Sequence, residues 1–160
     1  MKQIWAPWRM DYILERKSKN CIFCHPARTK YNKKKLLLYQ GEFSLVMLNR
    51  YPYTNCHLLI APRKHTNVLD LLSTEESLDL FSTLSKSVTI IKKSITPDGF
   101  NIGMNLGTIA GAGVKDHLHF HIVPRWNGDT NFMPILAESV VVPEHLEKAY
   151  DQLFPFFEKL

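Results

Sequence analysis

The chain has 160 residues, of which 45% are hydrophobic and 22% charged, and its formal net charge is +5. This composition is ordinary for a globular domain and excludes a disordered chain, and no apolar run approaches the ~18 residues of a membrane-spanning helix. The three cysteines do not indicate a disulfide scaffold, and the N-terminus lacks the apolar segment of a signal peptide. We therefore expect a cytoplasmic protein with no membrane partner, whose charge favours anionic ligands.

We expect a single domain over residues 1–160, made of an N-terminal arm (1–20), a core (21–125) and a C-terminal extension with a helix (126–160). The arm is too apolar for a free tail, so it is expected to pack on the domain or on a second subunit. Lys33-Lys34-Lys35 has no interleaved aromatic residues. We interpret these lysines as solvated surface and expect no nucleic-acid partner.

Short β-rich segments predict strands over residues 36–40, 42–48, 57–61, 100–106 and 117–124. A capping box, Ser73-Thr-Glu-Glu76, predicts the start of a long helix that ends before Pro97. Its apolar residues at helical spacing are Leu78, Phe81, Leu84, Val88 and Ile91. A C-terminal helix is expected to begin at Pro143 and to be interrupted at Pro155. The pattern predicts an α+β fold, with an antiparallel sheet of about five strands, one long helix and a C-terminal helix.

In the segment His117-Leu-His-Phe-His-Ile-Val-Pro124, three histidines alternate with apolar residues. Because side chains of a strand alternate between its faces, the imidazoles share one face and Leu118, Phe120 and Ile122 face the core. Imidazole can bind a metal ion or act as a nucleophile, so a catalytic metal site and attack on phosphorus both remain open. The glycine-rich 107–113 loop can cradle phosphate oxygens with backbone N–H groups, which favours phosphate chemistry.

The 117–123 segment resembles the motif of the histidine-triad (HIT) family, in which a histidine followed by an apolar residue is repeated three times. Three further segments carry the resemblance: Leu48-Asn-Arg-Tyr-Pro52 followed by His57, Met104-Asn-Leu-Gly107, and the pair formed by Trp5-Ala-Pro-Trp-Arg9 and Pro124-Arg-Trp-Asn-Gly-Asp-Thr-Asn-Phe132. The last pair is similar to the bacterial diadenosine tetraphosphate phosphorylase branch of the family. The likeness covers most of residues 4–150 and implies the HIT-like fold.

The resemblance implies that His119 is a nucleophile that attacks the α-phosphorus of a nucleotide and forms a nucleotidyl-histidine. Inorganic phosphate is the preferred acceptor, so that diadenosine tetraphosphate yields ATP and ADP. His121 is expected to donate to a phosphate oxygen, and His117 to brace the strand. The implied substrate contacts are Asn49 for the ribose, Asn105 and Gly113 for the phosphate, and Phe43, Val46 and Leu48 as candidates for the wall around the base.

Cys21-x-x-Cys24 has the spacing of half a tetrahedral zinc site. In some relatives two histidines complete such a site, and the corresponding residues here are His65 and His117. The resemblance therefore implies a structural zinc ion held by Cys21, Cys24, His65 and His117, with His25 as a spare candidate ligand and no organic cofactor.

Several alternatives remain open. Water could replace phosphate as the acceptor, or the substrate could be a nucleoside phosphoramidate. A protein of another class, a nucleotide-binding sensor without turnover, is a further alternative, and so is a metalloenzyme. The expected partners are a nucleotide or dinucleoside polyphosphate, inorganic phosphate, and further copies of the chain in a homodimer or higher homo-oligomer.

Overall fold

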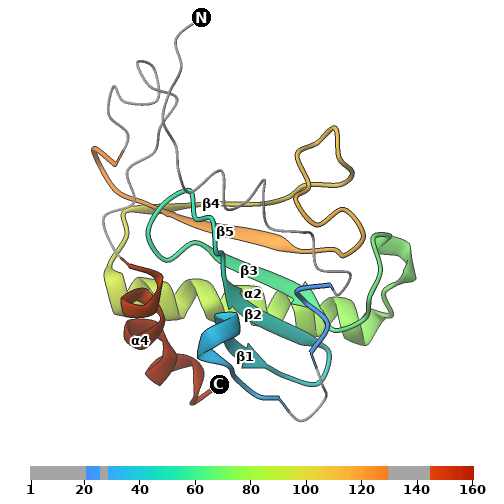
Figure 1. The fold of residues 1–160 in the computed structure, drawn as a ribbon, viewed down its shortest axis with the longest axis horizontal. Coiled ribbons are helices and arrows are strands. Elements are labelled where there is room, and N and C mark those ends of the chain that lie inside the picture. The colour runs from blue at the N-terminus through green and yellow to red at the C-terminus, as the bar shows by residue number, and fades with distance from the viewer. Residues whose placement is uncertain (1–20, 26–28, 130–144) are drawn as a thin grey trace, which may run out of the picture.

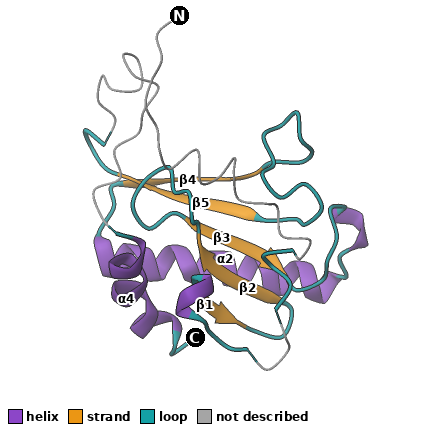
Figure 2. Cartoon of the chain, viewed as in Figure 1, coloured by secondary structure: helices purple, strands orange, loops and turns teal. Residues whose placement is uncertain are grey.

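Five antiparallel strands form one sheet in the order β1-β2-β3-β5-β4 in the structure, a computed structural model that describes residues 21–25, 29–129 and 145–160 (Figure 1, Figure 2). The strands span β1 Leu37–Gln40, β2 Ser44–Leu48, β3 Leu58–Pro62, β4 Gly99–Met104 and β5 Phe120–Arg125. The prediction of an antiparallel α+β sheet is therefore confirmed. The arm of residues 1–20 lies outside the described residues.

The long helix α2 spans Thr74–Ile95, and its predicted capping box is present. The backbone N–H of Glu76 donates to Ser73 Oγ at 3.1 Å, and Glu76 Oε2 accepts from the Ser73 N–H at 2.8 Å. The apolar residues at helical spacing do not all face the core, because Leu78 and Phe81 are 70% and 65% exposed. The buried residues of α2 are Leu80, Thr83, Leu84, Ser87, Ile90 and Ile91.

The rotation of α2 follows from a polar contact with β2. The Ser44 hydroxyl, fully buried, lies 2.6 Å from Asp79 Oδ2 and 2.8 Å from Thr83 Oγ1. Buried polar groups need such partners, so these bonds turn the Asp79–Thr83 side of the helix toward the sheet. Leu78 and Phe81 are thereby turned outward, which apolar periodicity alone did not reveal.

The C-terminal helix α4 spans Leu146–Phe157 and includes Pro155, so the predicted interruption at Pro155 is wrong. A proline removes one backbone hydrogen bond, and here that loss falls in the last turn, where the helix is about to end. The predicted start at Pro143 lies outside the described residues. Two short 3₁₀ helices, η1 Lys33–Lys35 and η2 Leu69–Leu71, complete the regular structure of the described part of the chain.

The two faces of the sheet differ in what covers them. One face packs against α2 and α4 in a core cluster that includes Leu38, Val46, Leu48, Leu58, Ile60 and Ile122. Figure 1 shows α2 running behind the strands along the sheet. The other face carries a smaller cluster made of Phe23, Leu37, Leu45, Met47, Leu59 and Ala61. The histidine segment meets this second cluster through Phe23, whose ring lies against His117 and His119.

β5 is shorter than predicted, because it begins at Phe120 and leaves His117 and His119 outside the ladder. Its pairing with β3 runs from Leu58–Ile122 to Ile60–Phe120. Farther along, β3 ends at Pro62, which has no N–H to donate. The chain before β5 is held instead by the N–H of Leu118, which donates to Thr66 O at 2.7 Å.

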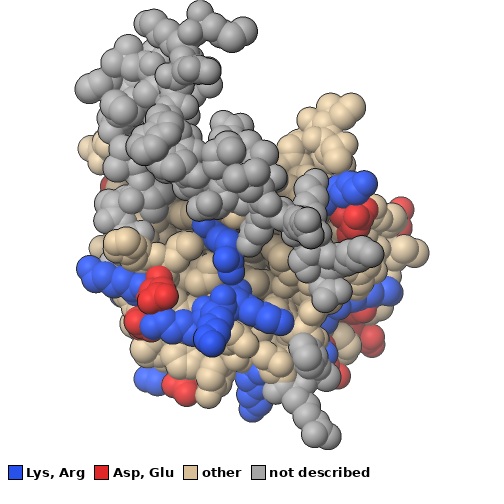
Figure 3. Space-filling view, in the orientation of Figure 1, with Lys and Arg blue, Asp and Glu red and all other residues tan. Residues whose placement is uncertain are grey.

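Basic side chains gather on one part of the surface, in the region of η1 and β1 (Figure 3). η1 itself consists of three lysines, and Lys33 Nζ bonds Asp151 of α4 at 2.7 Å. Within the described ranges, no helix has both the length and the apolar character needed to cross a membrane.

Candidate functional site

The histidines 117, 119 and 121 and the earlier His57 lie close together on the face of the sheet opposite α2. The ring centroids of His119 and His121 are 5.0 Å apart, and those of His57 and His121 are 5.1 Å apart. His57, His117 and His119 are 0%, 1% and 4% exposed. Three of the four imidazoles are thus buried and that of His121 is half-buried, so the ring nitrogens inside the protein need a partner or a function.

The proton of His119 is fixed by its own chain. His119 Nδ1 lies 2.9 Å from the carbonyl oxygen of His117. A carbonyl oxygen can only accept, so Nδ1 carries the hydrogen and donates. In a neutral imidazole the other nitrogen, Nε2, then keeps its lone pair. This is the arrangement that nucleophilic attack by a histidine requires.

His121 has the opposite tautomer, which is set through His57. The Tyr53 N–H and the Asn49 amide both donate to His57 Nδ1, at 3.1 and 3.2 Å. His57 Nε2 therefore carries the proton and donates to His121 Nδ1 at 2.9 Å. The remaining proton of His121 lies on Nε2, which is buried and has no hydrogen-bond partner among the described residues. His121 thus presents an N–H donor beside the lone pair of His119.

Burial keeps these rings neutral. It is the main cause that lowers the pKa of His57 to about 3, and the charges of His121 and His119 lower it further. The pKa of His121 falls to about 4, again through burial and then through the charge of His119. Burial also lowers the pKa of His119, although its hydrogen bond to the His117 backbone opposes the shift. Both tautomer assignments therefore apply to neutral rings at pH 7.

A second cluster lies on the far side of His117. Potential ligand atoms of Cys21, Cys24, His65 and His117 all lie within 4.8 Å of one another. His117 Nδ1 is 3.3 Å from Cys21 Sγ and 3.2 Å from His65 Nδ1, and Cys24 Sγ is 3.3 Å from His65 Nδ1. Ligand pairs around a tetrahedral zinc ion are about 3.3 to 3.8 Å apart, as its bond lengths require. The four predicted residues therefore fit a metal ion.

The tautomer of His117 supports the same conclusion. His117 Nε2 donates to Pro62 O at 2.7 Å, which leaves the lone pair of Nδ1 directed into the cluster. Metal-binding histidines are commonly held this way by a carbonyl acceptor. The spare candidate, His25, lies outside the cluster.

The residues predicted to contact the substrate lie in different parts of the structure. Asn49 is half-buried, donates to His57 and accepts the Tyr51 N–H at 3.0 Å, so its side chain supports the histidines as well as facing solvent. Asn105 and Gly113 lie in the loop that joins β4 to the histidine segment. Gly107 and Gly111 adopt φ values of +83° and +89°, which favour glycine.

Two of the three candidates for the base wall lie on the wrong face. Val46 and Leu48 are buried in the core cluster against α2, away from the histidines. Strand alternation instead puts Leu45 and Met47 on the histidine face. Phe43 precedes β2 with the same parity as these two residues and is half-buried.

Two residues of the site were given no role from the sequence. His57 was named in the segment that resembles the family and as the first residue of a predicted strand, and the pairing of β3 with β5 brings it to His121. Phe23 lies inside the Cys21-x-x-Cys24 motif and packs on His119 with ring centroids 5.0 Å apart. The order of the strands in the sheet would have indicated His57, whereas no local sequence pattern indicates Phe23.

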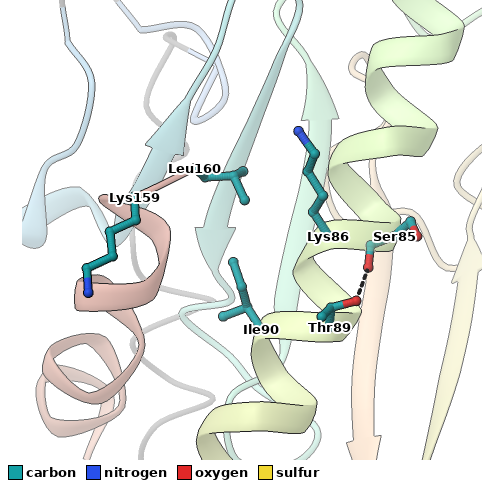
Figure 4. Close-up of a pocket in the computed structure, with 6 residues that line it drawn as sticks. All are labelled: Ser85, Lys86, Thr89, Ile90, Lys159 and Leu160. Atoms are coloured by element: carbon teal, nitrogen blue, oxygen red, sulfur yellow. Dashed lines mark hydrogen bonds between the residues drawn. The ribbon is translucent and has the colours of Figure 1, made fainter.

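A groove of about 400 Å³ lies elsewhere, between α2 and the C-terminus (Figure 4). It is lined by Ser85, Lys86, Thr89, Ile90, Lys159 and Leu160. Figure 4 shows the side chains of Lys86 and Lys159 pointing in different directions, so they do not converge on one ligand position. The groove includes none of the histidines, and we assign it no role.

Known proteins are similar to this chain in sequence and in fold. An AP-4-A phosphorylase of Mycobacterium tuberculosis is 36% identical over 154 residues, which cover 91% of this chain and 79% of the relative. An adenosine 5′-monophosphoramidase of Schizosaccharomyces pombe is 33% identical over 68% of this chain and 76% of its own length. The crystal structure of a zinc-bound histidine triad family protein from Mycobacterium smegmatis superposes with a TM-score of 0.63, at 27% identity, over 78% of this chain and 84% of that one.

The family model described as the HIT domain matches residues 30–128, which hold all five strands of the sheet, α2 and all three histidines of the motif. The resemblance inferred from the sequence is therefore confirmed, together with the HIT-like fold. The chain belongs to the HIT family, whose nucleotide-binding enzymes act on dinucleoside polyphosphates and phosphoramidates.

Proposed function

We propose that this protein cleaves dinucleoside polyphosphates, with diadenosine tetraphosphate as the preferred substrate, through a nucleotidyl intermediate on His119. One observation carries the proposal. The His119 ring donates its Nδ1 proton to the His117 carbonyl, so Nε2 holds a free lone pair beside the N–H of His121, which has no partner in the described part of the chain. A nucleophile and a hydrogen-bond donor are thereby placed together, as nucleotidyl transfer requires.

In the first step, the lone pair of His119 Nε2 forms a P–N bond to the α-phosphorus. The bond from phosphorus to the bridging oxygen breaks, and the polyphosphate leaves with the electron pair. Because this leaving group is a weak base, it needs no strong general acid. His119 keeps its Nδ1 proton throughout, and the His117 carbonyl stabilises the positive charge that develops on the ring.

The transferring phosphoryl group needs donors for its oxygens. We assign this role to the Nε2–H of His121, together with the amide of Asn105 and the backbone N–H of Gly113. The donor on His121 depends on His57, since His57 Nε2 donates to His121 Nδ1 and so keeps the His121 proton on Nε2. His57 is therefore a positioning residue, and Asn49, which donates to His57, also contacts the ribose in this account.

In the second step, an acceptor oxygen attacks phosphorus, and the P–N bond breaks to restore neutral His119. We favour inorganic phosphate as the acceptor, which yields ADP alongside the ATP released first. The 36% identical relative that spans most of this chain is an AP-4-A phosphorylase, which supports this choice. Water is the alternative acceptor, and the similarity to a monophosphoramidase supports phosphoramidates as alternative substrates. A sensor without turnover has no need for the free lone pair of His119.

We propose that Cys21, Cys24, His65 and His117 hold a structural zinc ion. Four protein ligands leave no open coordination position, so the ion supplies cross-linking rather than activation of a substrate. It would tie the segment before β1 to the end of β3 and to the histidine segment. The zinc-bound family structure supports this assignment.

We also propose a cytoplasmic homodimer or higher homo-oligomer. β4 has a strand neighbour, β5, on only one side within the described sheet, and its Ile102 is 45% exposed. An exposed strand edge offers unpaired backbone groups to a second copy of the chain.

Product analysis tests the proposed reaction. With diadenosine tetraphosphate, we expect the protein to release ATP and ADP only when phosphate is present, and His119→Asn to lower the rate by at least about 10³-fold, since no nucleophile remains. His145→Asn, an exposed histidine at the start of α4, is the matched control and should retain full activity. AMP with ATP would assign water as the acceptor. An active His119→Asn variant would refute the covalent mechanism.

Metal analysis tests the zinc site. We expect the protein, purified without a histidine tag, to contain one zinc ion per chain, because one four-donor cluster is present in the described residues. His65→Gln and Cys24→Ser should lose the ion, measured by mass spectrometry of the metal. His25→Gln changes a neighbouring histidine outside the cluster and should keep it. Equal zinc contents in His65→Gln and His25→Gln would contradict the ligand assignment.

The pH dependence tests the neutrality of the rings. With pKa values of about 3 for His57 and about 4 for His121, both stay neutral at a pH at which an ordinary histidine is mostly protonated. Because burial also lowers the pKa of the nucleophile His119, we expect the rate of nucleotidyl transfer to fall in acid only below the ordinary histidine value of about 6.5. Circular dichroism at each pH confirms that the protein is folded. An acid midpoint near 6.5 in folded protein would contradict the predicted burial effect.

A further inference from the structure

We propose that Phe23 is a positioning residue for His119, and that the Cys–His cluster serves the nucleophile by holding Phe23 and His117 in place. The inference rests on the proposed function, because it concerns the rate at which His119 receives a nucleotide. It extends the role of the cluster from support of the fold to alignment of the reacting ring.

Phe23 lies between the nucleophile His119 and the Cys–His cluster. Its side chain is 1% exposed, although its neighbour Ile22 is 48% exposed. The Phe23 ring centroid lies 5.0 Å from that of His119, at an interplanar angle of 34°, and 5.1 Å from that of His117, at 55°. The same side chain therefore contacts the proposed nucleophile and a proposed metal ligand.

The backbone around Phe23 is closed into a turn. The Cys24 N–H donates to the Cys21 carbonyl at 3.2 Å, and both thiols point to the cluster with His65 and His117. Phe23 is one of the two residues inside this turn. Coordination of both cysteines would fix the turn at each end, and so would fix where the Phe23 ring packs.

His119 needs such a contact because one hydrogen bond does not define its orientation. The bond from Nδ1 to the His117 carbonyl fixes one atom of the ring, so the position of Nε2 also depends on what packs against the rest of the ring. The flat side chain of Phe23, which lies against the His119 ring, supplies such a contact. The cost of misalignment is large, since a displacement of about 1 Å at a reacting group can lower a rate by about 10²-fold.

The hydrogen bond and the ring contact that hold His119 both come from residues that belong to the Cys–His cluster or lie within its cysteine turn. His117 offers its ring to the cluster and its carbonyl to His119. Phe23 lies between the two cysteines in the sequence, and its ring lies against that of His119 at an interplanar angle of 34°. The four metal-ligand residues thus orient the His119 ring through two contacts, one with the His117 carbonyl and one with the Phe23 ring, without contacting the substrate.

Phe23→Leu tests the proposal, because leucine keeps the burial and removes the flat ring. We expect single-turnover formation of the nucleotidyl-enzyme from diadenosine tetraphosphate, followed by intact-mass analysis, to slow by about 10- to 100-fold. The dissociation constant for AMP should stay within about twofold, and zinc content should stay at one per chain. Ile22→Leu, in the same turn, is the matched control and should react at the wild-type rate. If Phe23→Leu does not fold, Phe23→Met replaces it.

A second readout does not depend on turnover. In ring ¹⁵N spectra, wild-type His119 should show one Nδ1–H tautomer, whereas the Phe23 variant should show exchange-broadened or averaged shifts. An unchanged rate and spectrum would overturn the proposal, and so would a rate loss matched by an equal loss of AMP affinity, which would make Phe23 a binding residue. A wild-type protein that forms no nucleotidyl-enzyme would instead refute the proposed function.

Discussion

The hydrogen bond from His119 Nδ1 to the His117 carbonyl is the contact on which the rest of the site depends. It exists because the ladder between β3 and β5 stops at the Ile60–Phe120 pair, just before the histidines. A carbonyl at position 117 is therefore available to an imidazole instead of a neighbouring strand. Pro62 takes part in this ending, since it has no N–H, and its own carbonyl accepts from His117.

The donor and acceptor capacity of the imidazole ring explains why His117, His119 and His121 have different roles in similar surroundings. A neutral imidazole has one donor and one acceptor, so one fixed partner decides what the other nitrogen does. Carbonyl partners leave His117 with a lone pair toward the cysteines and His119 with a lone pair beside His121. His121 faces a donor, His57, and so keeps its proton on the other nitrogen, Nε2. Burial lowers the pKa of each ring, so that the pattern persists at neutral pH.

Much of the fold could be predicted from the sequence, because strands and caps leave local patterns. The capping box at Ser73 and the alternation around Phe120 are of this kind. Features that depend on distant partners could not. The rotation of α2 follows from the bonds between Ser44, Asp79 and Thr83, which periodicity does not encode. A helix also tolerates Pro155 because its position is close to the end.

The candidate site also combines residues that a local sequence pattern predicts with residues that only the tertiary structure reveals. The cysteine pair, His65 and the histidine motif were predicted as residues, and the structure brings the four predicted ligands together. Val46 and Leu48, which were candidates for the base wall, lie in the core cluster against α2, because alternation along β2 places Leu45 and Met47 on the histidine face. His57 and Phe23 join the site only through sheet order and ring packing, which are tertiary properties.

The most direct test of this account is the assignment of ring protons by ¹⁵N NMR of histidine-labelled protein at pH 7. The account predicts that His119 is protonated on Nδ1 and His121 on Nε2, and that His57→Gln alters the shifts of His121 while His119 keeps its tautomer. The matched control His145→Asn should leave both rings unchanged. A wild-type His119 protonated on Nε2, or charged at pH 7, would contradict the account, because no lone pair would then be available for attack.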